Sequence, residues 1–66
     1  MAVTEEALAR KFEVMLPVLN ERQRRVLLGA EAQAWGRGGI SLVARTAGVS
    51  ATTVRKGLAE IAQGAE

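Results

Sequence analysis

The side chains with the clearest chemical use lie in one stretch, Ile40–Leu58, near the end of the chain. Within it, the hydroxyl groups of Ser50 and Thr52 come just before the cations of Arg55 and Lys56. An arginine can pair with guanine in a bidentate way, and serine, threonine and lysine can bond bases or phosphates. This chemistry indicates recognition of a nucleic acid by hydrogen bonds and charge. It does not include a nucleophile next to a base, so bond cleavage is not indicated.

The same stretch predicts two helices joined by a tight turn, the first over residues 40–47 and the second over residues 50–62. Gly48 suits a turn that needs a positive φ, because glycine has no Cβ to clash there. Ser50 can cap the second helix through its hydroxyl group. This layout is typical of a DNA-binding helix-turn-helix, whose second helix lies in the major groove.

The spacing of apolar residues predicts which side of the second helix is free. Val54, Leu58 and Ile61 recur at i, i+4 and i+7, so their side is expected to be buried. Gly57 departs from a generic motif and weakens helix propensity by about 1 kcal/mol relative to alanine, but it could allow close approach of the helix over residues 21–35. We predict that the residues on the free side read bases: Ser50, Ala51, Thr52, Arg55 and Lys56.

Charge is distributed unevenly along the chain. The net charge is only +2, yet the segment from Arg22 to Lys56 holds seven basic residues and one acid, Glu31. A basic centre between acidic ends favours a surface that faces a polyanion, although solvated helix faces are an alternative. We expect Glu31 either to lie at the rim of the apolar arc of its helix or to pair with a basic residue, for which Arg45 or Arg24 could serve, because an unpaired buried charge is costly. The predicted phosphate contacts are Arg22, Arg25, Arg37, Arg45 and Thr53.

Upstream, a first helix is predicted over residues 5–16. Thr4 can cap this helix, and Pro17 disfavours helical geometry at the residue before it. The apolar stripe of the helix is expected to pack against the rest of the domain. An alternative is that it forms a homodimer through three of its residues, Leu8, Phe12 and Met15.

A further helix is predicted over residues 21–35. Asn20 and Gln23 fit a capping box at its start, and Gly36 is expected to end it. Its apolar residues predict a broad arc that touches both neighbouring helices: Val26, Leu27, Leu28, Ala30, Ala34 and Trp35. The side opposite this arc is expected to hold Arg22, Arg25, Ala32 and Gln33.

The composition limits the class of protein. A chain of 66 residues makes one small domain, and its richness in Ala, Leu and Val predicts an all-α fold of four short helices. Without Cys or His, the usual zinc sites and catalytic pairs cannot form, so we expect no metal, no cofactor and no enzyme activity. No apolar run approaches the ~20 residues that span a bilayer. We expect a cytoplasmic, nucleoid-associated protein with no membrane contact and no small-molecule ligand.

A resemblance to a known family covers the chain from about Arg10 to Ile61. Its more specific blocks are Leu-Asn-Glu-Arg-Gln-Arg-Arg at residues 19–25 and Gly-Gly-Ile-Ser at residues 38–41. The chain resembles the N-terminal region of bacterial insertion-sequence transposases with a DDE-type catalytic domain. The resemblance implies a module that recognises the terminal inverted repeats of a transposon. Catalysis in such proteins belongs to a downstream domain with three metal-binding acids, to which no part of these 66 residues corresponds.

Two other functions fit the same residues. One is a stand-alone transcriptional regulator, which would bind a promoter operator instead of transposon ends. The other is a helical protein-interaction or dimerisation module, which would not bind duplex DNA in a salt-dependent way. The main prediction from the sequence remains sequence-specific binding of double-stranded DNA.

Overall fold

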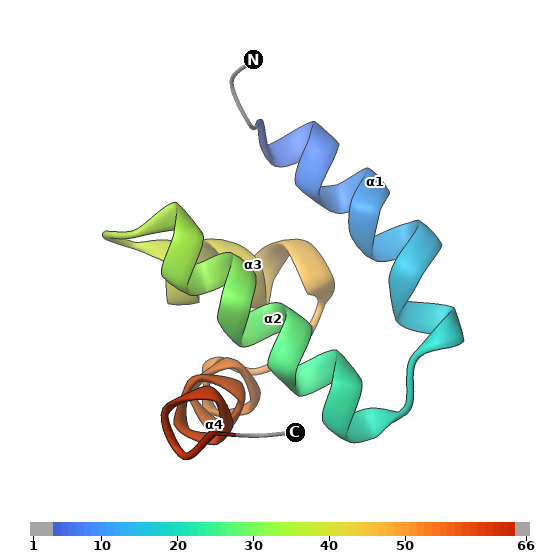
Figure 1. Ribbon diagram of the computed structural model, residues 1–66. Coiled ribbons are helices and arrows are strands. Elements are labelled where there is room, and N and C mark those ends of the chain that lie inside the picture. Colours follow the sequence, from blue (N-terminus) through green and yellow to red (C-terminus); the bar gives the residue numbers. More distant parts are fainter. Residues whose placement is uncertain (1–3, 65–66) are drawn as a thin grey trace.

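The computed structural model describes residues 4–64, and Figure 1 shows their arrangement. Four α-helices occur, joined by short connections, and no strand occurs in this part of the chain. The helices are α1 (Glu5–Met15), α2 (Glu21–Trp35), α3 (Gly39–Ala47) and α4 (Ala51–Ala62), with a 3-10 turn η1 (Leu16–Val18) after α1. The fold is all-α, as predicted, and each helix end lies within one residue of the predicted bound.

Local side-chain caps set where the helices begin. The Thr4 side chain accepts a hydrogen bond from the Ala7 amide at 3.1 Å. The Asn20 side chain accepts one from the Gln23 amide at 2.8 Å, and the Gln23 side chain accepts one from the Asn20 amide at 2.9 Å. Such bonds satisfy amide groups that have no partner inside the helix. The capping box predicted at the start of α2 is therefore present.

All four helices contribute to one core. Figure 1 shows α2 crossing in front of α3, with α1 on one side and α4, seen nearly end-on, on the other. Burying a large aliphatic side chain contributes about 1.5–3 kcal/mol. The buried apolar residues are Leu8, Phe12, Leu28, Ala32, Leu42, Val43, Ala44 and Val54. Among the described helices, none combines the length and the apolar character needed to cross a membrane.

The helices α2 and α4 cross at two glycines. A Cβ atom built on Gly57 would overlap the carbonyl group of Arg25, and one built on Gly29 would lie 2.7 Å from the carbonyl carbon of Gly57. Only a residue without a side chain allows two helix backbones to approach so closely. Gly57 therefore permits the close approach to α2 that we considered from the sequence.

The predicted orientation of α2 was wrong on both of its sides. Ala32 was expected on the outer side, but it is only 4% exposed, and its carbonyl lies against Gly39 at the start of α3. Ala30, Ala34 and Trp35, which were expected to face neighbours, are exposed. The reason is that α3 and α4 pack closest where α2 is smallest, at Gly29 and Ala32. A helical wheel cannot separate Ala32 from Ala30 and Ala34 by residue type, because all three are alanine.

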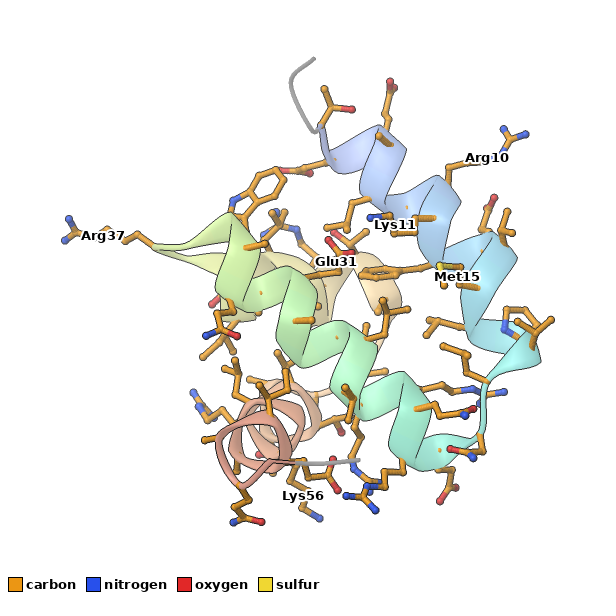
Figure 2. All side chains as sticks on the ribbon, viewed as in Figure 1. Arg10, Lys11, Met15, Glu31, Arg37 and Lys56 are labelled. Carbon is orange, nitrogen blue, oxygen red and sulfur yellow. The ribbon has the colours of Figure 1, made fainter. Side chains whose placement is uncertain are left out.

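Two corrections concern α1. Glu31 pairs with Lys11 at 2.8 Å, and Figure 2 shows the two side chains pointing toward one another. The prediction of Arg45 or Arg24 as its partner was wrong, because α1 lies close enough for Lys11 to reach it. Leu8 and Phe12 are 1% and 3% exposed and belong to the core of the single chain. Of the three residues predicted for a homodimer, Met15 is therefore the one that remains exposed.

The connection between α3 and α4 is a turn of three residues that begins at Gly48. Gly48 has φ 74° and ψ 33°, in the left-handed region. The amide groups of Gly48 and Val49 both donate to the Ala44 carbonyl, at 2.9 and 3.0 Å. The bond from Val49 is the six-to-one bond of a Schellman helix end. The turn thus sets the angle at which α4 leaves α3.

Replacing Gly48 by valine is expected to destabilise the domain by about 1–3 kcal/mol, because a β-branched residue is strained at positive φ. A Cβ at this position would have no neighbour within 4 Å, so the cost is confined to the backbone. The control is Gly48→Asn, which should cost less because asparagine tolerates this conformation. Thermal melting measures both variants. A Gly48→Val protein that melts like the wild type would show that the turn does not need a positive φ.

Candidate nucleic-acid interface

One side of α4 faces away from the core. Val54 and Gly57 are buried, and Leu58 and Ile61 are partly buried, so these residues form the packing side of the helix. With 3.6 residues per turn, the residues between them form a strip on the opposite side. The strip, which we call the free face of α4, is exposed and consists of Thr52, Arg55, Lys56, Ala59 and Gln63.

The start of α4 is held by hydroxyl groups. The Ser50 hydroxyl accepts a hydrogen bond from the Thr53 amide at 3.2 Å, and the hydroxyl groups of Ser50 and Thr53 lie 3.1 Å apart. The predicted cap at Ser50 is therefore present. Of the residues predicted to read bases, Ser50 and three members of the free face are exposed, whereas Ala51 is half-buried. The first turn of α4 is thus capped by side chains of its own residues.

Two cations of α4 are unengaged. Arg55 and Lys56 are exposed, and within residues 4–64 neither makes an ion pair or a side-chain hydrogen bond. Neither side chain is tied to another residue by such a bond in this part of the chain. Their donors are therefore available to an outside acceptor such as a base edge or a phosphate.

The arginines predicted to contact phosphates differ in how exposed they are and in whether they already pair with an acid. Arg22 and Arg37 are exposed, and Figure 2 shows Arg37 extending outward from the tip of the connection between α2 and α3. Arg45 lies 3.3 Å from Glu5, with both side chains more than 60% exposed. An exposed ion pair of this kind contributes about 0–1 kcal/mol, so a phosphate can readily displace Glu5. Arg22, Arg37 and Arg45 thus remain usable.

Arg25 is different, because it holds α2 to α4. Its Nε and one terminal nitrogen donate to the two carboxylate oxygens of Glu60 at 3.1 and 2.7 Å. Both side chains are about three-quarters covered. The hydrogen bonds from Arg25 lower the pKa of Glu60, and the charges of Arg22 and Lys56 lower it further. Arg25 is therefore mainly an interhelical ion-pair residue, and Glu60 lies among several cations.

This ion pair predicts a specific acid sensitivity. A carboxyl group whose pKa is lowered by folding stabilises the folded state above its ordinary pKa of 4.5, and the stabilisation is lost as the pH falls through the lowered value. A Glu60→Gln variant should melt at a lower temperature than the wild type near neutral pH. The gap should close as the pH falls below about 4.5. Thermal melting at several pH values measures it, and a gap that persists in acid contradicts the ion-pair role.

A groove beside α4 was not predicted from the sequence. It has a volume of about 440 Å³ and lies between η1, the first turns of α2 and the first turns of α4. Its polar lining includes Arg24, which was predicted only as a possible partner of Glu31. No local pattern marks Arg24, because its position depends on how η1 folds back onto α2. We call this hollow the basic groove, defined by Leu16, Glu21, Arg24, Arg25, Thr53 and Lys56.

The arrangement offers hydrogen-bond donors and positive charge on the side of the molecule where α4 is free. Within residues 4–64, no group of three or more acidic side chains is placed to hold a metal ion. Chemically, the region can pair with an anion and present donors to planar acceptors. Both are properties that binding to a nucleic-acid duplex requires.

Comparison with known proteins adds no further constraint: no protein-family model matches this sequence, and no curated protein and no solved structure matches it either.

Proposed function

We propose that α3 and α4 form a helix-turn-helix that binds double-stranded DNA in a sequence-specific way. The observation that carries the proposal is the free face of α4, which keeps two cations without ion-pair partners in the described residues beside a capped helix start. An α-helix fits the major groove, and a helix-turn-helix sets the N-terminal part of its second helix against base edges.

In this mechanism the first turns of α4 enter the major groove. Thr52 and Arg55 face base edges, where the threonine methyl can touch a thymine methyl and the arginine can pair with guanine. Phosphates on the groove walls are contacted by Arg22, Arg37 and Arg45. The phosphate contacts position α4, and the base contacts supply the sequence preference.

The proposed target is the end of a transposon. This part of the proposal rests on the resemblance of the chain to the N-terminal region of insertion-sequence transposases. In that setting the module would act in the bacterial cytoplasm on the nucleoid, and cleavage would belong to another domain. A promoter operator is the target expected if the chain instead acts as a transcriptional regulator.

Selection of bound duplexes from a random library tests the proposal. We expect enrichment of one motif, which can then be compared with inverted repeats and with operators. A wild-type protein that recovers no duplexes above background would contradict DNA binding. Recovery without any motif would contradict sequence-specific recognition while leaving a non-specific DNA-binding protein.

A further inference from the structure

The basic groove has a positioned cation on one wall. Arg24 is exposed, and its Nε donates to the carbonyl oxygen of Leu16 at 2.7 Å. The guanidinium group has five N–H donors, and this bond uses one of them. Within residues 4–64, Arg24 makes no other side-chain hydrogen bond. The two terminal nitrogens of an oriented guanidinium are therefore left for an acceptor from outside.

Lys56 supplies the second cation. Its side chain belongs both to the free face of α4 and to the lining of the basic groove. Figure 2 shows Lys56 at the edge of α4 on the side of the first turns of α2. The groove thus flanks the part of α4 that is proposed to enter the major groove.

Both acids near the groove act on Arg25, and the charge of Lys56 also acts on one of them, Glu60. Glu60 bonds Arg25, and the pKa of Arg25 is raised first by that hydrogen bond and also by the charge of Glu21. Two acids therefore act on Arg25. Arg24 and Lys56 have no ion-pair partner within the described residues, so the groove retains positive charge.

We propose that the basic groove binds one phosphate of the DNA backbone, with the terminal nitrogens of Arg24 and the ammonium group of Lys56 as donors. The inference rests on the proposed function, and it changes two assignments. Arg24 becomes a phosphate contact that the sequence did not indicate, and Lys56 contacts the backbone instead of a base. The arrangement fits a helix in the major groove, because phosphates line both walls of that groove and the basic groove lies along one side of α4.

The first test is the salt dependence of binding to the selected duplex. Each lost phosphate contact should reduce the slope of log K against log salt by about 0.9. Because Arg24 and Lys56 share one phosphate, the variant that carries both Arg24→Ala and Lys56→Ala should show this reduction in full and each single variant only a part of it, with weaker binding to every sequence and an unchanged selected motif. Lys56→Arg should retain the slope. The matched control is Arg10→Ala, because Arg10 is exposed on α1 and points away from the molecule in Figure 2.

A second test locates the phosphate. Neutral methylphosphonate linkages are placed one at a time along both strands of the selected duplex. At one or two adjacent linkages, neutralisation should weaken wild-type binding several-fold. The same linkages should have no further effect on a variant that carries both Arg24→Ala and Lys56→Ala. Thermal melting of this variant checks that it is folded.

The outcomes separate the inference from the proposed function. An unchanged salt slope in the double variant, or a double variant that senses every linkage as the wild type does, overturns the phosphate site alone. A changed motif in Lys56→Ala would return Lys56 to base reading and also overturn the site. Absence of duplex binding by the wild type would overturn the proposed function, and the phosphate site with it.

Discussion

Replacing Gly57 by alanine is expected to destabilise the domain by about 3 kcal/mol or more, the upper end of the cost of overpacking a core. The new Cβ would overlap the backbone carbonyl of Arg25 and crowd the amide of Gly29, and neither atom can swing aside as a side chain would. The crossing of α2 and α4 would have to open. For a domain of this size, such a loss lowers the melting temperature by about 10–25 °C.

Gly36→Ala is the control for this variant. Unlike the helical Gly57, Gly36 has a positive φ, at 91° with ψ −136°, but a Cβ there would meet nothing within 4 Å, so only a backbone cost of about 1–3 kcal/mol is expected. Thermal melting compares the two. If Gly57→Ala melted like the wild type, α2 and α4 could not cross at their glycines, and the position of α4 would have to be revised.

Replacing Arg55 by alanine should produce the largest change in recognition. We expect binding to weaken by about 1–3 kcal/mol, which is roughly 5- to 150-fold, with relaxed preference at one base position. Stability should hardly change, because Arg55 is exposed and makes no ion pair within residues 4–64. Repeating the duplex selection with this variant measures the preference at every position.

Arg10→Ala again serves as the control, since it removes the same charge from an exposed site on α1. It should leave the motif as it is. A motif that is the same for the wild type and Arg55→Ala would remove Arg55 from the readout. It would leave the rest of the interface to be tested by other members of the free face.

The helix bounds could be predicted from the sequence because the signals that set them are local. Thr4, Asn20 and Ser50 each bond an amide three residues farther along the chain. Gly48 needs only its own backbone conformation to turn the chain. Interactions over so few residues are visible in a linear pattern.

Packing between helices could not be predicted in the same way. The partner of Glu31 is Lys11, 20 positions away, and the pairing exists only because α1 folds back beside α2. The burial of Ala32 depends on Gly39 approaching it closely. Small residues carry a weak hydrophobic signal, although they permit the closest contacts.

The candidate interface likewise has one part that depends on local sequence signals and another that depends on packing between helices. The free face of α4 follows from the helical period, so Arg55 and Thr52 were predicted as exposed residues. The role of Arg25 as an ion-pair residue requires Glu60, which lies 35 positions away. The groove at Arg24 likewise requires the fold of η1. The periodic part of the interface was therefore visible in the sequence, and the part built across helices was not.

The central claim, that α4 binds duplex DNA, is tested most directly by measuring binding of the wild-type domain to duplex over a range of salt concentrations. Several contacts from Arg22, Arg24, Arg37, Arg45 and Lys56 should make log K fall steeply with log salt, by about 0.9 for each phosphate contact. The account predicts binding at low salt that weakens with this multiple-contact slope. No duplex binding at low salt, or binding that does not respond to salt, would contradict it.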